Sequence, residues 1–219
     1  MNYHETLEPT MSARTADIAI RMQIAASVRA ILRSVTDDAQ LVRLRAVEQT
    51  SEHLQCVVAG IEEDLLAFSE KDPAAHGSPQ LILDTYVSFE AILHYRIARY
   101  VLESGAFDPA LAMTTAHKLA NRGKARTGID INPCANIGRR FTLDHGYGTV
   151  IGETCEIGDD CYVLGGVVLG GLSIAGNPIG KRHPTIGNQV EIGAFARVLG
   201  NVTIGDEVFI SPHCVIVDD

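Results

Sequence analysis

A short basic segment, Lys181-Arg182-His183-Pro184, carries side chains suited to binding an anion and to moving a proton. The guanidinium of Arg182 can bind a carboxylate through two parallel hydrogen bonds. A histidine with an unperturbed pKa of about 6.5 can exchange protons near neutral pH. The segment follows Gly176-Asn177-Pro178, which is a turn signal. We therefore expect a binding site around a loop that ends near His183.

The elements that must position this loop form a repeat with a period of six residues. Its 13 recurring positions are Ile, Leu or Val: Ile131, Ile137, Leu143, Ile151, Ile157, Val163, Leu169, Ile186, Ile192, Val198, Ile204, Ile210 and Ile216. Seven of them are followed by glycine, which we expect to relieve tight corners. This period fits one side of a triangular coil, and stacked coils bury a continuous aliphatic column. The interruptions at 146–149 and 170–185 then predict a small bulge and one extruded loop.

The first part of the chain predicts helices instead. Only five of the 20 glycines precede Ile131, and apolar residues recur there at helical spacing. We expect helices over 11–35, over 41–68, from Pro79 to about 104, and from Pro109 to about 121, the last two capped by Ser78 and Asp108. The fold class is therefore α+β, with a helical domain at 1–129 and a repeat domain at 130–219.

The cysteines argue against a disulfide scaffold and against a zinc site. Five is an odd number, and no two of them form a C-x-x-C pair. The repeat places Cys155, Cys161 and Cys214 in the packed interior, whereas Cys134 is out of phase and is expected to be the most accessible. We expect reduced thiols and no metal ligands.

Composition excludes several other classes. Charged residues make up 21% and hydrophobic residues 46% of the chain, as in soluble globular proteins. The net charge of −9 argues against a general binder of nucleic acids or anionic membranes. No window approaches the roughly 20 apolar residues of a membrane span, and residues 1–5 do not open a signal peptide. We expect a cytoplasmic protein with neither nucleic-acid nor membrane partners.

Several motifs resemble those of the serine O-acetyltransferases. In the repeat region they are Asp130-Ile131-Asn132-Pro133, Leu143-Asp144-His145-Gly146, Val150-Ile151-Gly152-Glu153-Thr154, Val168-Leu169-Gly170-Gly171 and Arg182-His183-Pro184. Upstream, Lys71-Asp72-Pro73-Ala74 resembles the family's Arg-Asp-Pro-Ala, and residues 89–97 resemble the helix that precedes its repeats. The resemblance covers about residues 70–217, and so both parts of the chain.

The resemblance implies a left-handed parallel β-helix after the helical domain. It also implies a homotrimer or a dimer of trimers, with active sites between adjacent β-helices. The reaction would transfer acetyl from acetyl-CoA to the hydroxyl of L-serine, giving O-acetyl-L-serine for cysteine biosynthesis. Acetyl-CoA would be a co-substrate with no permanently bound cofactor, and L-cysteine would inhibit. Because the matched motifs contain no serine or cysteine nucleophile, we expect direct attack without an acyl-enzyme.

The same resemblance implies the catalytic and coenzyme-binding residues. His145 matches the family's general base, and Asp130 matches the carboxylate that holds its ring. They are 15 residues apart, nearly one 18-residue coil, and this spacing is compatible with contact between them. Backbone N–H groups near Gly171 and Ala194 match the places that receive the pantetheine arm and the thioester, and they can stabilise an oxyanion.

Four further residues match positions that bind the amino-acid acceptor. Arg182 and His183 would bind its carboxylate, and Asp72 and Asp144 its ammonium. Each has an alternative structural role: Asp72 could cap a helix at the Asp-Pro turn, Asp144 could be a surface charge, and the other two could form a solvated loop pair.

The sequence also departs from the family pattern. The stretch between Gly171 and Arg182 is about three residues longer than usual, Glu90 stands where histidine is usual, and the connection from Arg96 to Asp130 is longer. These departures affect the expected identity of the acceptor more than the expected class of reaction. L-serine is favoured, and L-homoserine or a related β-hydroxy amino acid is the alternative.

Three other functions fit the sequence less well. A hexapeptide acyltransferase for a sugar or an antibiotic is disfavoured by the Asp-His and Arg-His-Pro motifs. A zinc enzyme like the γ-class carbonic anhydrases is disfavoured because His145, His183 and His213 include no closely spaced pair. An inactive scaffold is disfavoured because all the matched site residues are present.

The chain ends soon after its last repeat, at Val217-Asp218-Asp219. Many family members bind cysteine synthase through a flexible C-terminal tail that ends in isoleucine. From the absence of such a tail we expect no stable complex with cysteine synthase.

Overall fold

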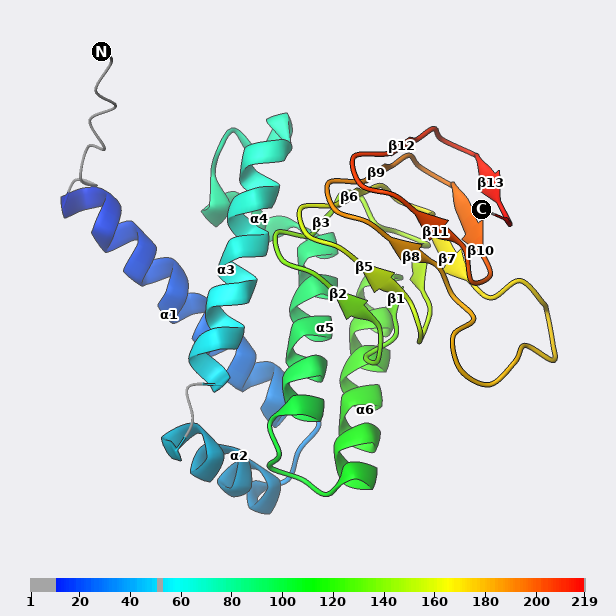
Figure 1. Ribbon diagram of the computed structural model, residues 1–219. Helices are drawn as coiled ribbons and strands as arrows, with labels where there is room; N and C mark the ends of the chain where they lie inside the picture. The colour runs from blue at the N-terminus through cyan, green and yellow to red at the C-terminus, as the bar shows by residue number, and fades with distance from the viewer. Residues whose placement is uncertain (1–10, 51–52, 219) are drawn as a thin grey trace, which may run out of the picture.

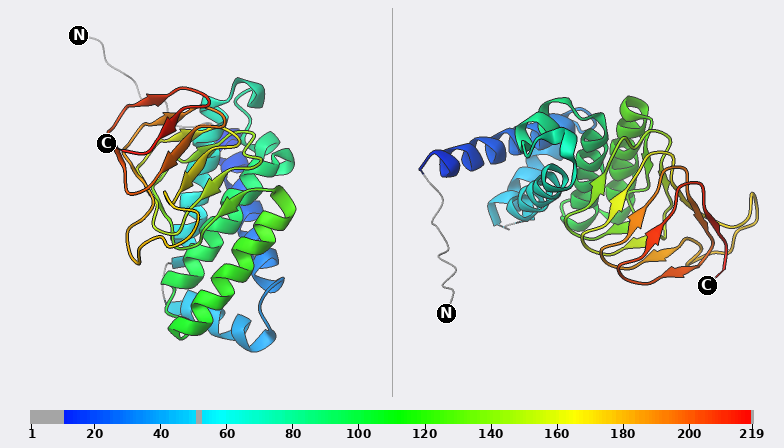
Figure 2. Two further views of the ribbon diagram at one scale, coloured as in Figure 1. Left: turned by 90° about the vertical axis from the view of Figure 1, so that its right-hand side faces the viewer. Right: turned by 90° about the horizontal axis from the view of Figure 1, so that it is seen from above.

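The computed structural model describes residues 11–50 and 53–218. A group of helices from the first half of the chain packs beside a stack of short strands from the second half (Figure 1). The last coils lie at the end of the stack farthest from the helices (Figure 2). One cluster of buried apolar side chains runs through both parts. None of the described helices is long and apolar enough to cross a membrane.

The described residues form six α-helices and one short 3-10 helix. They are α1 (Met11–Arg33), α2 (Asp38–Thr50), α3 (His53–Lys71), the 3-10 helix Pro73–Ala75, α4 (Pro79–Thr85), α5 (Val87–Glu103) and α6 (Pro109–Thr127). The two predicted caps are confirmed: Ser78 accepts a hydrogen bond from the Leu81 N–H, and Asp108 accepts one from the Leu111 N–H.

Three predicted helix boundaries are wrong. The helix expected from Pro79 to about 104 is divided at Tyr86, whose backbone is extended (φ −84°, ψ 110°). The helix expected over 41–68 is two helices, and the junction residues 51–52 lie outside the described part of the chain. The last helix continues to Thr127, where Gly128 with φ 71° ends it, because glycine adopts this left-handed conformation without strain.

The second half of the chain is a left-handed parallel β-helix. Its strands are β1 (Asp130–Ile131), β2 (Asn136–Ile137), β3 (Thr142–Leu143), β4 (Val150–Ile151), β5 (Glu156–Ile157), β6 (Tyr162–Val163), β7 (Val168–Gly170), β8 (Thr185–Ile186), β9 (Glu191–Ile192), β10 (Arg197–Leu199), β11 (Thr203–Ile204), β12 (Phe209–Ile210) and β13 (Val215–Ile216). All 13 aliphatic positions of the repeat lie in these strands, which confirms the predicted period.

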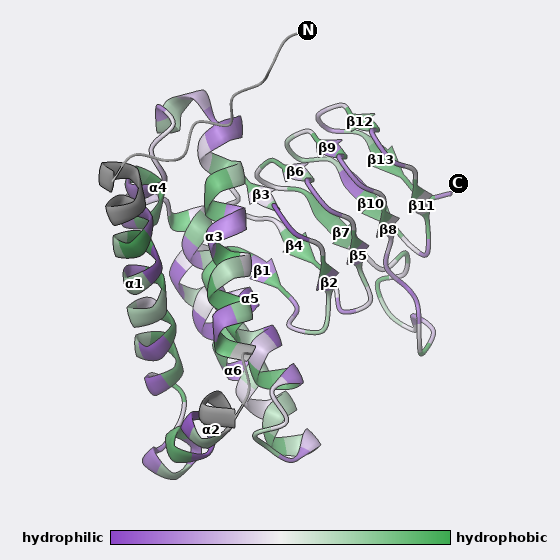
Figure 3. Cartoon of the chain, turned by 60° about the vertical axis from the view of Figure 1, so that its left-hand side comes forward, coloured by the Kyte–Doolittle hydropathy of each residue, from purple (hydrophilic) through white to green (hydrophobic). Residues whose placement is uncertain are grey.

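Three parallel sheets form the sides of the β-helix. Sheet A has the order β1-β4-β7-β10-β13, sheet B β11-β8-β5-β2, and sheet C β12-β9-β6-β3. Equivalent aliphatic residues stack in register, for example Ile131 on Ile151 and Ile151 on Leu169. The side chains of these three residues are buried. The hydropathy colours show the apolar residues repeating along the stacked strands (Figure 3).

The glycines of the repeat have a different role from the one expected. A Cβ on Gly138 would lie 2.6 Å from the carbonyl of Gly158 in the next coil, and a Cβ on Gly158 would lie equally close to Gly187. Glycine is therefore required there by the close approach of stacked coils. The left-handed corner conformations fall largely on other residues, including His145 (φ 58°) and Phe195 (φ 61°).

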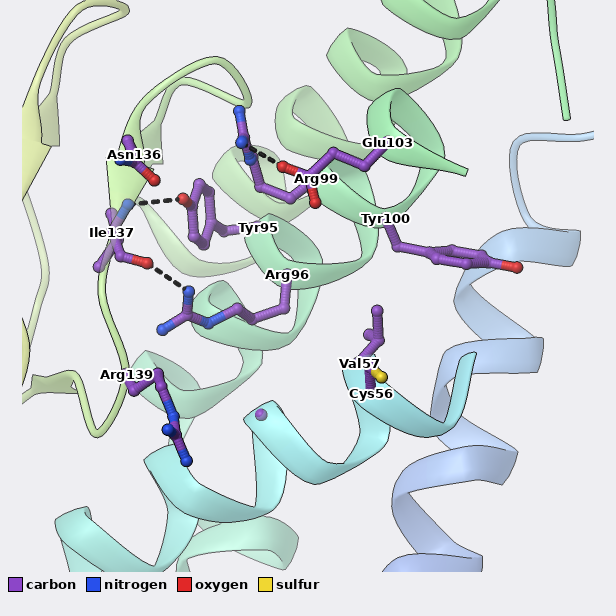
Figure 4. A pocket seen from close by; sticks show the side chains of 11 residues that line it. Cys56, Val57, Tyr95, Arg96, Arg99, Tyr100, Glu103, Asn136, Ile137 and Arg139 are labelled. Carbon is purple, nitrogen blue, oxygen red and sulfur yellow. Dashed lines mark hydrogen bonds and ion pairs between the residues drawn. The ribbon is translucent and has the colours of Figure 1, made fainter. Parts of the chain in front are cut away.

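Buried polar contacts join the helical part to the first coil (Figure 4). The Arg96 guanidinium on α5 donates to the carbonyl oxygens of Ile137 (2.7 Å) and Gly138 (2.5 Å), and its Nε donates to Asp64 (2.8 Å). Asp64, whose side chain is fully buried on α3, also accepts from the Phe141 N–H (2.9 Å). These bonds fix the orientation of the helices relative to the β-helix.

Candidate active site

The candidate residues of the repeat region lie at two corners of the β-helix. We call residues 144–149, 164–167, 193–196 and 211–214, which lead from sheet C to sheet A, the C–A corner. We call residues 152–155, 171–184 and 200–202, which lead from sheet A to sheet B, the A–B corner. Asp144, His145 and Ala194 lie at the C–A corner, whereas Gly171, Arg182 and His183 lie at the A–B corner.

His145 projects into solvent at the C–A corner. Its side chain is 83% exposed, and its Nε2 lies 3.7 Å from Asp144 Oδ2. The Cβ of His145 would lie 3.6 Å from a Cβ built on Gly165, so the corner of the next coil passes directly beside the histidine. The imidazole is therefore available to a ligand on its outer side.

Asp130 is bonded to Lys124 and not to His145. Asp130 opens β1, and its Oδ2 lies 2.6 Å from Lys124 Nζ at the end of α6. Its backbone N–H donates to Thr149 O, the last residue of the corner that begins at Asp144. The predicted Asp130–His145 pair thus shares one region of the β-helix, but the hydrogen bond between the two is not formed in this structure.

Asp72 and Asp144 form a cluster with two tyrosines. Tyr86 Oη donates to Asp72 Oδ2 (2.8 Å), and Tyr162 Oη donates to Asp144 Oδ2 (2.9 Å). The hydrogen bond to Asp72 raises the pKa of Tyr86 to about 12, with smaller contributions from burial and Asp144. Burial and the hydrogen bond to Asp144 raise the pKa of Tyr162 above its usual range, and Asp72 adds to this. Each carboxylate thus acts electrostatically on the tyrosine that is bonded to the other carboxylate.

Asp72 fills its alternative role as well. Its Oδ1 accepts from the Ala74 N–H (2.9 Å) and so caps the short 3-10 helix, while Oδ2 faces Tyr86. The residue is 8% exposed. Capping thus fixes the carboxylate at the junction of the helical part and sheet C.

Arg182 and His183 are held by Thr154 at the A–B corner. Thr154 Oγ1 accepts from the backbone N–H groups of Arg182 (3.0 Å) and His183 (3.1 Å). The Arg182 guanidinium pairs with Glu153. A polar substrate group at this corner would therefore meet an arginine that already has one carboxylate partner.

The ring of His183 is oriented and kept neutral by its surroundings. The Thr154 N–H donates to Nδ1 (3.1 Å), which assigns the proton of the neutral imidazole to Nε2. Burial, and then the neighbouring Arg182, lower the pKa of His183. A Cβ on Gly152 would lie 2.2 Å from Nε2, so only glycine leaves room for the ring. His183 can therefore donate a hydrogen bond from Nε2.

The two predicted coenzyme positions lie at opposite ends of the strands of sheet A, with Gly171 after β7 and Ala194 before β10. Gly171 opens the extruded loop, where Asn177 Oδ1 accepts from the Ser173 N–H (3.0 Å). The Ala194 carbonyl accepts from the His213 N–H (3.0 Å) at the C–A corner. The loop projects away from the column (Figure 1), as the interrupted repeat predicted.

The cysteine predictions are partly wrong. Cys155 and Cys161 are buried as expected, and burial raises the pKa of Cys155 to about 12. Cys56, on the outer surface of α3, is exposed, whereas Cys134 is half-buried with its Sγ 3.7 Å from Met113 Sδ. Cys214 is also half-buried, because it lies in the last described coil. Over 11–50 and 53–218, no three His, Cys, Asp or Glu side chains are grouped to hold a metal ion.

A cavity also lies elsewhere, at the junction of the helical part and the β-helix. It has a volume of about 310 Å³ and is lined by Tyr95, Arg96, Arg99 and Arg139, among others (Figure 4). Arg99 pairs with Glu103, and Arg139 pairs with Glu63. Its cations are thus neutralised by internal contacts, and none of the candidate residues lines it.

Known proteins resemble this chain in sequence and in structure. Residues 183–218 match the family model for bacterial transferase hexapeptide (six repeats). The chain is 43% identical over 150 residues to a serine acetyltransferase of Helicobacter pylori, and the match covers 68% of this chain and 82% of that relative. A structure of the Neisseria gonorrhoeae serine acetyltransferase in complex with serine superposes with a TM-score of 0.66 and 31% identity, over 91% of this chain and 89% of that one. Serine acetyltransferase 1 of Entamoeba histolytica in complex with L-cysteine superposes with a TM-score of 0.70 and 31% identity, over 100% of this chain and 78% of that one.

Proposed function

The chain belongs to the serine acetyltransferase family, and we propose that it transfers the acetyl group of acetyl-CoA to the hydroxyl of L-serine. The product, O-acetyl-L-serine, would enter cysteine biosynthesis. The observation that supports an amino-acid acceptor is the pair of Asp72 and Asp144, each of which accepts a tyrosine hydrogen bond and acts electrostatically on the tyrosine of the other. In the described structure neither carboxylate is bonded to a lysine or an arginine, and Asp144 has only the His145 ring at 3.7 Å, so the pair favours an ammonium group.

In the proposed site the carboxylate of L-serine is bound by Arg182 and His183. Arg182 supplies a charged fork, and the neutral His183 supplies the Nε2 hydrogen. A zwitterionic amino acid thus finds an anion-binding pair and a cation-binding pair. The two pairs fix its orientation, which is the main contribution to a direct transfer between two bound substrates.

The separation of these pairs supports an active site shared between two copies of the chain. Within one chain, Asp144 and Arg182 lie at opposite ends of the strands of sheet A, with a whole side of the coil between them. L-serine is too short to span that distance. If the C–A corner of one β-helix faces the A–B corner of a neighbour, both pairs reach one acceptor. A closed ring of such contacts gives the trimer, alone or as a dimer of trimers.

The exposed apolar residues of the extruded loop support the same arrangement. Ile174 and Ile179 are fully exposed in the single chain, and both precede Arg182 in the loop. Apolar side chains displayed together next to a binding pair are typical of a surface covered by another chain.

Chemically, His145 acts as the general base in this proposal. The acceptor hydroxyl gives its proton to the imidazole while its oxygen attacks the thioester carbonyl carbon. The C–O bond forms, the C–S bond breaks, and the leaving thiolate of coenzyme A takes the proton from the imidazolium. The His145 side chain is exposed, so the bound substrates can orient its ring. In that orientation Asp130 accepts a hydrogen bond from the ring.

Acetyl-CoA binds in this scheme between the same two corners. The backbone N–H groups near Gly171 and Ala194 receive the pantetheine arm and the thioester, from opposite sides of the shared cleft. They would also stabilise the negative charge that develops on the thioester oxygen. Acetyl-CoA is a co-substrate here, and no permanently bound cofactor is proposed.

L-cysteine is proposed as an inhibitor of this site. It carries the same ammonium and carboxylate as L-serine, and the complex of the Entamoeba histolytica relative with L-cysteine supports binding of this amino acid. The kinetic signature would be competition with L-serine.

The function is tested by an acetyl-CoA consumption assay over a panel of hydroxy amino acids. We expect the highest kcat/KM with L-serine and formation of O-acetyl-L-serine. A higher kcat/KM with L-homoserine would replace L-serine as the acceptor, and no transfer to any hydroxy amino acid would reject the proposed reaction.

A further inference from the structure

A second cavity lies beside the two-carboxylate cluster. It has a volume of about 400 Å³ and is lined by Lys71, Asp160, Tyr162, Gln189 and Glu191. Tyr162 and Glu191 are paired residues of β6 and β9, so the cavity lies over the outer face of sheet C. Lys71, which bonds Asp160 (2.7 Å), lies directly before Asp72. The cavity and the carboxylate cluster are thus neighbours.

Tyr162 is the residue that the cavity and the cluster share. Its hydroxyl donates to Asp144 Oδ2 (2.9 Å), and the same residue lines the cavity. Its partner one coil earlier, at the same outward position, is Thr142. A threonine at 162 would be too short to reach Asp144, and it would leave the space of the aromatic ring open to the cavity.

The chemistry of the acceptor makes this space important. In the proposed site the ammonium is fixed by Asp72 and Asp144, and the hydroxyl must reach His145 beside them. An acceptor with one more methylene, such as L-homoserine, must place the extra carbon against whatever surrounds the carboxylate cluster. A rigid aromatic wall there excludes it, whereas an open cavity accommodates it.

We propose that Tyr162 determines the length of the acceptor, by forming the wall between the ammonium site and the cavity over sheet C. This inference rests on the proposed serine acetyltransferase reaction. It assigns Tyr162 a specificity role without a chemical step: the ring sets the size of the site, and the hydroxyl holds Asp144 in place. One methylene in a closed pocket is worth about 10- to 200-fold in kcat/KM.

The test compares kcat/KM for L-serine and L-homoserine in the full chain and in Tyr162→Thr. We expect the serine-to-homoserine ratio to fall at least about tenfold in Tyr162→Thr, through a gain with L-homoserine. Tyr162→Phe keeps the ring and loses only the hydroxyl, so it should retain the wild-type ratio. KM for acetyl-CoA should change little in either variant, because the wall does not face the coenzyme.

Glu191→Ala is the matched control, because Glu191 lines the same cavity on the next strand and is not bonded to Asp144. Its ratio should equal that of the wild type. An unchanged ratio in a folded Tyr162→Thr protein that still acetylates L-serine would overturn the inference and leave the proposed function intact. Failure of the wild type to acetylate L-serine would overturn the proposed function itself. If Tyr162→Thr does not fold, the same serine-to-homoserine ratio of kcat/KM is measured in Tyr162→Leu, and an unchanged ratio there overturns the inference.

Discussion

Lys124 Nζ lies 2.6 Å from Asp130 Oδ2, so a lysine in the last turn of α6 forms an ion pair with the first residue of the β-helix. Both side chains are about half exposed in the single chain. Since Asp130 is the carboxylate proposed to hold His145, the charge of Lys124 acts on the general base through Asp130. This makes Lys124 a positioning residue whose effect appears in the pH profile.

Replacing Lys124 with glutamine should move the acid limb of the kcat/KM profile to higher pH. Without the ammonium, the negative charge of Asp130 is felt fully by His145 and stabilises the imidazolium. Removing the cation therefore favours the protonated, inactive form of the base, so kcat/KM rises only at a higher pH. Lys124→Arg keeps the charge and should retain the wild-type profile. Identical acid limbs in Lys124→Gln and wild type would show that Asp130 does not act on His145.

Arg182→Ala should weaken the acceptor much more than the coenzyme. The lost guanidinium is the proposed partner of the acceptor carboxylate, and removing such a partner costs about 2 kcal/mol or more, roughly 30-fold in affinity. Steady-state kinetics with each substrate varied in turn measure the two effects separately. An equal rise in KM for both substrates would indicate collapse of the loop instead.

Arg96→Met should destabilise the whole chain. It leaves Asp64 fully buried without its cation, and breaking such a pair costs about 3–5 kcal/mol. Chemical denaturation measures the loss. Arg139→Met is the matched control, because the Arg139–Glu63 pair lies on the surface and should add little to stability. Equal stability of the two variants would contradict the role given to the Arg96 contacts.

The stability of the protein should fall as the pH is lowered from about 6.5. Burial lowers the pKa of His94 in the native state, whereas the unfolded chain titrates near 6.5. Below that pH the unfolded state binds more protons, so stability is lost until the native pKa is passed. The buried Nε2 of His94 has no hydrogen-bond partner among the described residues, so nothing there stabilises a protonated His94 ring. His94→Gln should make the free energy of unfolding less dependent on pH between 6.5 and 5, and an unchanged dependence would contradict this cause.

The period of six predicted the β-helix because each aliphatic residue must face the same column. Ile131, Ile151 and Leu169 stack one coil apart, so a local pattern encodes a long-range contact. The break at Tyr86 is different in kind, since no turn residue marks it. Its hydroxyl donates to Asp72, 14 positions earlier in the chain. A tertiary contact of this kind produces no periodic pattern in the sequence.

The candidate residues were found through motifs, and their partners were not. Tyr162 occupies an ordinary outward position of the repeat, and only the structure shows that it bonds Asp144. Lys124 lies at the end of a helix whose predicted boundary fell short of it. Nor can one sequence show that Asp144 and Arg182 lie at different corners, because this depends on how the coils close.

The central claim is that the two corners form one active site across two copies of the chain. It is tested most directly by coexpressing His145→Ala with Arg182→Ala and assaying at L-serine concentrations well below KM, where each variant alone should be nearly inactive. In mixed rings, a neighbour pair that joins an intact C–A corner to an intact A–B corner restores a complete site. Random mixing gives about one such pair in four, so we expect acetylation of L-serine at about a quarter of the wild-type rate. Mixed rings that are no more active than the separate variants would contradict the shared site.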